Sequence, residues 1–127
     1  MCLDAISRTK LDKEEQSGIG YKVISKIYVR QANKTYYETC GRGIIFKKNN
    51  RWVHKEKSPA KIEAYAGKYK SGFHICQKIT DARKYASSWN GIIQVKYRKA
   101  HTIGIQRNAN IIVADEMRYV KVMRNCE

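Results

Sequence analysis

The amino-acid sequence predicts a single α+β domain with a mainly antiparallel β-sheet and two short helices. Three observations support this: the chain has 127 residues, many short β-forming runs are separated by turn residues, and two stretches show helical signals. A hydrophobic content of 43% with one proline argues against intrinsic disorder. We expect residues 1–18 to form a loosely ordered lead-in, because they mix both signs of charge, and residues 19–127 to form the domain.

Short strands are predicted for the first half of the domain. "YKVISKIYVR" (21–30) largely alternates, so most of its apolar residues share one face and its cations share the other, where Ile24 and Tyr28 are mixed in. The cations are Lys22, Lys26 and Arg30. "TYYETC" (35–40) would complete a hairpin. Residues 43–55 hold two more apolar runs, and Asn49-Asn50 between them favours a tight turn.

Two stretches carry helix signals. In the first, Ser58 is a good N-cap, Pro59 suits the first helical position and Gly67 would end the helix. In the second, Thr80 would cap a helix whose apolar residues recur at intervals of three and four, and Asn90-Gly91 would stop it. The apolar residues of this second helix are Ala82, Tyr85, Ala86 and Trp89.

The last third is predicted to be a strand followed by a hairpin whose second strand is long. "IIQVKYRK" (92–99) alternates, so Tyr97 faces the apolar side while Lys96 and Arg98 face the opposite side. "TIGIQ", "RNAN" and "IIVADEMRYVKVM" then read as strand, turn and strand. The facing pattern changes near Asp115-Glu116, which indicates a β-bulge there.

Charge is the most unusual property of the composition. There are 26 Lys and Arg against 11 Asp and Glu, a formal net charge of +15. Such an excess repels itself in the folded state, so it favours an anionic partner such as nucleic acid, a nucleotide, a membrane surface or an acidic protein. The alternative is a lysine-rich surface that reflects the base composition of the genome.

Cysteine usage and hydropathy bear on location. The four cysteines are far apart, the N-terminus lacks the apolar stretch of a signal peptide, and no run approaches the roughly 18 apolar residues of a membrane helix. We therefore expect a cytoplasmic protein with reduced thiols and no membrane association.

Catalytic and metal motifs are weak in this sequence. His74 and Cys76 would lie on the same face of a strand. The sequence favours a buried, packed pair over a nucleophile with its base. Zinc-ligand spacing and glycine-rich phosphate loops are absent. Asp115 and Glu116 would face opposite ways on a strand, so they do not form an acid–base pair without a bulge. We predict no enzyme, no metal and no cofactor.

Cations interleaved with aromatic residues indicate binding. Basic runs at 47–57, 68–70 and 96–99 each contain an aromatic ring, and this mixture suits phosphates together with bases. If strands 21–30 and 92–99 share a sheet, one solvent face collects five cations, with Arg107 at its rim. The five are Lys22, Lys26, Arg30, Lys96 and Arg98. That face could also be half of a pocket between copies, so we expect a homo-oligomer, a dimer or higher.

The span 72–123 resembles a type of small phage and prophage protein. In that type, a Gly-Phe-His-x-Cys strand leads to a short helix and then to two apolar strands. The matching residues here are Gly72, Phe73, His74, Cys76, Asp81, Ala82, Tyr85, Val95, Val113, Ala114, Glu116 and Met117. The chain is also similar to the Thoeris anti-defence proteins, and this resemblance implies sequestration of a cyclic signal derived from NAD. The helix-then-strand layout is similar to part of the ADP-ribosyltransferase fold, but the N-terminal His or Arg signature is missing.

These observations lead to one hypothesis: a phage protein that sequesters a nucleotide-derived immune signal in the host cytoplasm without catalysis. Arg98 and Arg107 would clamp phosphates, Tyr97 or Phe73 would stack on a base, and Asn90 would hydrogen-bond to a base edge or ribose. Two alternatives stay open. One is an anti-CRISPR-like inhibitor or a direct nucleic-acid binder that acts through the basic face, and the other is a degenerate ADP-ribosyltransferase-like domain.

Overall fold

The computed structural model describes residues 3–29, 34–39, 45–46, 51–55, 65–66 and 69–126. It confirms the predicted fold class, a small α+β fold dominated by antiparallel strands, with one α-helix and one 3-10 helix among the described residues. The elements are β1 (Ala5–Arg8), η1 (Lys13–Gln16), β2 (Gly18–Val29), β3 (Lys34–Thr39), β4 (Ile45–Phe46), β5 (Val53–His54), β6 (Tyr65–Ala66), β7 (Tyr69–Lys70), β8 (Phe73–Cys76), α1 (Ile79–Tyr85), β9 (Gly91–Gln106) and β10 (Ala109–Arg124).

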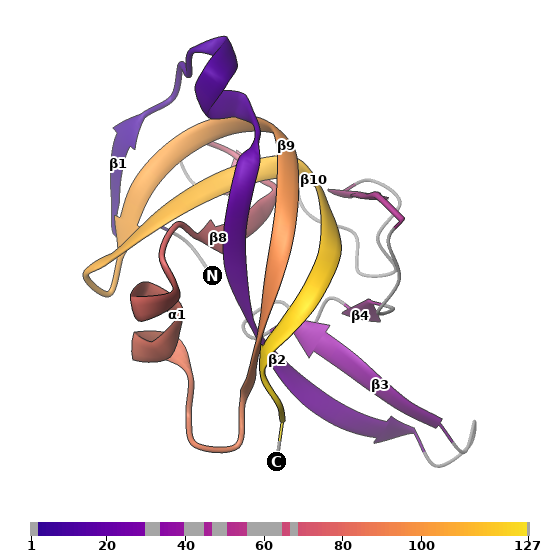
Figure 1. The fold of residues 1–127 in the computed structure, drawn as a ribbon. Coiled ribbons are helices and arrows are strands. Elements are labelled where there is room, and N and C mark those ends of the chain that lie inside the picture. Colours follow the sequence, from indigo (N-terminus) through magenta and orange to yellow (C-terminus); the bar gives the residue numbers. More distant parts are fainter. Residues whose placement is uncertain are drawn as a thin grey trace.

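Four strands close into a ring at the centre of the fold. The long strands β9 and β10 form an antiparallel hairpin that arches over the molecule (Figure 1). β10 also pairs with β8, and β9 also pairs with β2. β8 and β2 meet at Tyr21 and Cys76, which completes the ring. Outside the ring, β1 pairs with the C-terminal half of β9, and the β2–β3 hairpin extends away at the lower right of Figure 1.

Side chains alternate between the two faces of these strands, so the strands contribute to two hydrophobic clusters. Phe73 and Ile75 of β8 belong to one cluster, which also contains Ile24, Ile93, Val95, Ile112 and Ala114. The intervening residues form the second cluster with Ala82 of α1, and they include Val23, Cys76, Ile92, Ile111 and Val113. Each strand of the ring therefore contributes apolar residues from both of its faces, and α1 covers the second face.

The β9–β10 hairpin has the predicted turn, but the bulge expected near Asp115-Glu116 of β10 lies on β9 instead. Arg107 and Asn108 both adopt left-handed backbone conformations, with φ of 48° and 62°, as a two-residue primed turn requires. The register shifts where Val113 faces Thr102 and Ala114 faces Ala100, so His101 of β9 is the extra residue. Facing patterns in one strand do not tell which of two paired strands carries an insertion.

Several other expectations need correction. The lead-in contains β1, which pairs with β9, and Arg8 there forms an ion pair with Glu15 of η1. β4 pairs with β3 and β5 pairs with β10, so the two runs around Asn49-Asn50 are not a hairpin. The first predicted helix lies mostly outside the described residues, and its end, Tyr65–Ala66, is strand β6.

The second predicted helix is confirmed but shorter than expected. α1 ends at Tyr85, and Lys78, not Thr80, is its N-cap residue. Asn90 accepts a hydrogen bond from the Ser87 backbone N–H, which forms a separate turn after the helix. Trp89 in that turn is 61% exposed. A local turn held by an asparagine side chain therefore replaces the last helical turn.

Gly20 shows why β2 and β8 can approach each other. A Cβ atom at this position would lie 2.3 Å from Cγ2 of Ile75 and 2.9 Å from the carbonyl oxygen of Cys76. A larger residue would force the strands apart where the ring closes. None of the described helices is long and apolar enough to span a bilayer.

Candidate functional site

A pocket of about 320 Å³ opens between α1, β2, β8 and the β9–β10 turn. Its volume lies within the range of small-molecule sites. Three of the predicted binding residues line it, namely Lys22, Asn90 and Arg107. The other lining residues are Tyr21, Val23, His74, Cys76, Tyr85, Ser87 and Ile111.

Arg107 and Tyr85 form the mouth of this pocket. The Arg107 guanidinium lies 5.8 Å from the centroid of the Tyr85 ring, within cation–π range. The Tyr85 hydroxyl donates to the carbonyl of Gln106, and the backbone N–H of Arg107 donates to Asp4 at 2.8 Å. Burial raises the pKa of Tyr85 to about 12, so the ring stays neutral. The turn is thus anchored while the guanidinium itself remains exposed.

His74 and Cys76 contribute one wall of the pocket but are poorly suited to chemistry. The His74 ring contacts the Gly72 carbonyl through Nδ1 at 3.1 Å and the Tyr69 hydroxyl through Nε2 at 2.8 Å, so both nitrogens are engaged. Burial raises the pKa of the Cys76 thiol to about 11, although the nearby Lys22 charge opposes this. At neutral pH the sulfur is therefore a protonated thiol, which is a weak nucleophile.

Lys22 and Asn90 reach the pocket from buried positions. Lys22 is 6% exposed, and its ammonium donates to the backbone carbonyl of His74. The Asn90 side chain donates to Ser25 Oγ at 2.9 Å and accepts from Ser87, so it also holds the turn in place. Both residues were predicted to bind ligand, and in the structure the side chains of both also make hydrogen bonds within the fold.

The predicted face of five cations does not form. In the β2–β9 ladder, Lys22 lies opposite Ile93, a core residue, and residues opposite each other share a face. Lys96 and Arg98 are an odd number of residues from Ile93, so they lie on the other face. Lys26 is exposed on β2 and lines neither pocket, and Arg30 lies outside the described residues.

Phe73 cannot stack on a ligand, because its side chain is completely buried in the first core cluster. The "FHIC" pattern correctly indicated a buried strand, but Phe73 and His74 point to opposite faces of it. An aromatic wall is instead supplied by Tyr85, which the sequence marked only as a helix core residue.

A second pocket, of about 360 Å³, contains three further predicted binding residues. Lys96, Tyr97 and Arg98 line it, together with Ser17, Gly18, Ile19, Trp52 and Arg118. We call this the Trp52 groove. Trp52 was part of a predicted basic run, whereas Arg118 was missed because the bulge at His101 determines what it faces. With an unbroken register Arg118 would lie opposite Tyr97, but in the structure it lies opposite Lys96.

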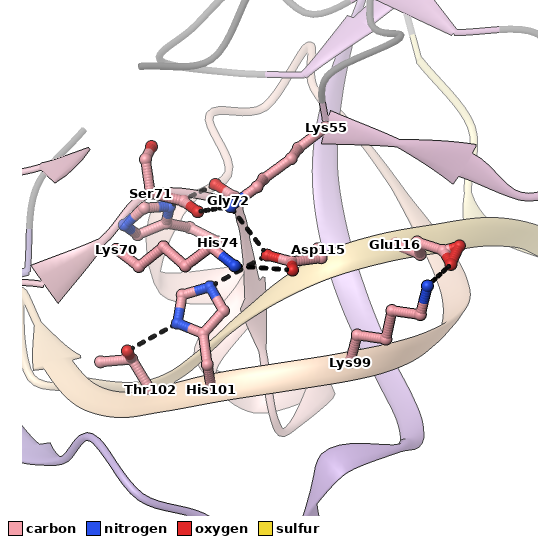
Figure 2. A network of polar contacts seen from close by, with 10 residues as sticks. All are labelled: Lys55, Lys70, Ser71, Gly72, His74, Lys99, His101, Thr102, Asp115 and Glu116. Atoms are coloured by element: carbon pink, nitrogen blue, oxygen red, sulfur yellow. Dashed lines mark hydrogen bonds and ion pairs between the residues drawn. The ribbon is translucent and has the colours of Figure 1, made fainter. Parts of the chain in front are cut away.

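A polar network around Asp115 lies next to His74, which also lines the first pocket (Figure 2). The carboxylate of Asp115 lies 3.0 Å from the ammonium of Lys55, 3.2 Å from Lys70 and 3.3 Å from His101 Nε2. Lys55 also donates to the carbonyl of Ser71 at 3.0 Å, and its side chain is 4% exposed. Burial tends to raise the pKa of Asp115, but hydrogen bonds from Lys55 and Lys70 outweigh it and lower the pKa.

Glu116 makes a separate cluster from its neighbour in the sequence. Its carboxylate lies 3.1 Å from Arg98 and 3.2 Å from Lys99, and the hydrogen bond from Arg98 is the main reason that its pKa is lowered. Asp115 and Glu116 thus point to different partners, as alternation on a strand requires. They do not form an acid–base pair.

Within the described ranges, no group of three His, Cys, Asp or Glu side chains could hold a metal ion. Cys76 and Cys126 are free thiols, and the other two cysteines lie outside the described residues. No protein-family model matches the chain, and no significant similarity to a curated protein or to a solved structure was found. Function must therefore be inferred from the two pockets themselves.

Proposed function

We propose that the protein binds a small, phosphorylated, nucleotide-derived ligand in the pocket beneath α1 and holds it without chemical change. The observation that supports this best is the charge of the pocket. Lys22 and Arg107 line it, and none of its described lining residues is acidic. An anion is the natural occupant, since cations facing a cavity without a carboxylate lower the potential energy of a phosphate there.

Arg107 is the main phosphate ligand in this proposal. Its guanidinium is exposed and makes no ion pair with any described residue, so its donors are available to a phosphate. Arg107 is itself a residue of the left-handed turn, and the fixed backbone of this turn restricts where its side chain can reach. Tyr85 beside it offers an aromatic surface to a base, and the Asn90 amide offers polar contacts at the pocket wall.

Binding without catalysis is consistent with the groups in this pocket. The Cys76 thiol is kept protonated by burial, and the Tyr85 hydroxyl is kept protonated in the same way. His74 has hydrogen-bond partners on both ring nitrogens. No described lining residue therefore combines a free nucleophile with a free base.

The phage context comes from the resemblance alone, and it suggests that the ligand is a cyclic isomer of ADP-ribose or a cyclic nucleotide. A homo-oligomer remains part of the proposal, because the exposed mouth at Arg107 could be covered by a second copy. Sequestration would then require one ligand per subunit or per interface.

Native mass spectrometry tests the proposal directly. The protein is mixed with cyclic dinucleotides, cyclic ADP-ribose isomers, NAD and inorganic phosphate, and intact adducts are weighed. We expect one adduct of unchanged mass per subunit or per dimer, and isothermal titration calorimetry of that ligand gives its affinity. Conversion of the ligand during long incubation would contradict binding without catalysis.

Arg107→Gln is the decisive variant, and Arg83→Gln is its matched control. Loss of a charge-assisted contact to phosphate should weaken binding by about 10- to 100-fold. Arg83 is an exposed cation on α1 outside the pocket, so its substitution removes the same charge and should change affinity less than about twofold. Equal affinities of the two variants would exclude this pocket as the site.

A further inference from the structure

The Trp52 groove is built from four separate parts of the chain, and Ser17, Gly18 and Ile19 around the start of β2 are one of them. Trp52 precedes β5, Lys96 and Arg98 lie on β9, and Arg118 lies on β10. The guanidinium carbons of Arg98 and Arg118 lie 4.0 Å and 5.4 Å from the centroid of the Trp52 ring. The indole is therefore held against two guanidinium groups, which keeps these long side chains extended over one surface.

The charges in this groove are not balanced. Lys96 and Arg118 lie directly opposite each other across the β9–β10 ladder, and like charges in this arrangement repel. Neither residue forms an ion pair with another described residue. Nε of Arg118 is buried without a hydrogen-bond partner. Glu116 is the nearby carboxylate on the same face, and it already pairs with both Arg98 and Lys99.

We infer that the Trp52 groove binds single-stranded nucleic acid, with backbone phosphates held between Lys96 and Arg118. A phosphate would relieve the repulsion between these two cations. Lys96 and Arg98 are two residues apart on β9, about 7 Å, so the groove presents cations along a line and not at one point. This site lies apart from the pocket at Arg107, and the inference does not depend on the proposed small ligand.

The flat and apolar surfaces of the groove favour a single strand over a duplex. The guanidinium of Arg98 is stacked on Trp52 and its side chain is 44% exposed, so its outer face is open to a base. Ile19, 50% exposed at the start of β2, adds an apolar contact. Unpaired bases stack on such surfaces, whereas a duplex keeps its bases inside and would use only the cations.

Tryptophan fluorescence offers a direct readout, because the chain has two tryptophans and only Trp52 lines the groove. In a Trp89→Phe background, oligothymidine and oligouridine of about 12 nucleotides should quench Trp52 by stacking. A duplex of the same length should quench it far less. The logarithm of the binding constant should fall with the logarithm of salt with a slope near −2, about −0.7 for each phosphate held by the three cations.

The double variant Lys96→Gln/Arg118→Gln tests the site, and Arg83→Gln/Lys121→Gln removes the same charge elsewhere. The first should lower the affinity for the oligonucleotide at least tenfold and reduce the magnitude of the salt slope by about 1.4. The second alters two exposed cations outside the groove and should keep the Trp52 quenching. The first variant should melt no lower than the parent, because it removes a repulsive pair.

Three results would overturn the inference: no oligonucleotide binding at about 50 mM salt, binding without Trp52 quenching, or equal losses in the two double variants. The last result would mean that binding depends only on net charge. Arg107→Gln separates this site from the proposed small-ligand pocket, since it should leave oligonucleotide binding unchanged whether or not the small ligand binds.

Discussion

The Asp115 network and the pocket at Arg107 share one histidine, His74, but their cations have different surroundings. Both gather cations beside polar backbone groups. In the network, Lys55 is buried against a carboxylate 3.0 Å away. In the pocket, Arg107 is exposed and has no ion-pair partner among the described residues.

This difference separates cations that stabilise the fold from exposed cations whose donors remain available to a ligand. A buried ammonium needs oxygen partners, such as Asp115 and the Ser71 carbonyl for Lys55 or the His74 carbonyl for Lys22, because an uncompensated charge in the interior is costly. An exposed guanidinium needs none, so its lack of a carboxylate carries no penalty and leaves its donors for a ligand. Residue type alone does not distinguish the two cases.

The largest expected effect is on stability. Asp115→Asn removes the carboxylate and leaves Lys55 charged and buried, which should lower the free energy of unfolding by about 3 to 5 kcal/mol. Arg107→Gln should change it by less than about 0.5 kcal/mol. Urea denaturation of both variants measures the contrast. If Arg107→Gln costs as much as Asp115→Asn, Arg107 belongs to the fold and the distinction fails.

Glu116→Gln should have a smaller effect than its neighbour. Its partners Arg98 and Lys99 have side chains that are 44% and 61% exposed, so they can turn to water, and we expect a loss of about 1 to 2 kcal/mol. The pKa of Glu116 is lowered in the folded state, mainly by the hydrogen bond from Arg98. Its contribution is therefore present above about pH 4.3 and is lost as the pH falls through the folded value.

A series of urea denaturations from neutral to acid pH tests this sign. Between neutral and acid pH, the free energy of unfolding should fall less in Glu116→Gln than in the parent protein. The part of this fall that comes from protonation of Asp115 should remain. An unchanged acid limb would show that the Arg98 ion pair is not formed in solution.

The smallest expected effect is a shift in a histidine titration. Burial lowers the pKa of His101, Asp115 opposes this, and Lys55 and Lys70 lower it further. His101 therefore favours the folded state above about pH 6.5, and this contribution is lost as the pH falls through its folded pKa. Lys70→Gln removes an exposed cation and should raise the pKa of His101, as measured by NMR. A pKa that falls or stays constant would contradict the network in Figure 2.

Much of the fold could be predicted from local patterns. The β2, β3 and β10 strands, the turn at Arg107-Asn108 and a helix before Asn90 all follow from alternation and turn chemistry. The sequence divides β9 into two strands, whereas in the structure it is one continuous strand, Gly91–Gln106. The residues that line the two pockets could be predicted only in part. Lys22, Asn90 and Arg107 do share a pocket, and Lys96, Tyr97 and Arg98 share another, but the cations of the two groups were expected on a single face.

The sequence by itself determined which segments are strands, which residues are basic and that no local catalytic motif is present, because these properties depend on near neighbours. Tertiary structure decided which cations meet. The single extra residue at His101 moves Lys96 opposite Arg118, and the β2–β9 register places Lys22 opposite a core residue. Register depends on how separate strands close the ring, and a shift of one residue reverses the face of every side chain beyond it.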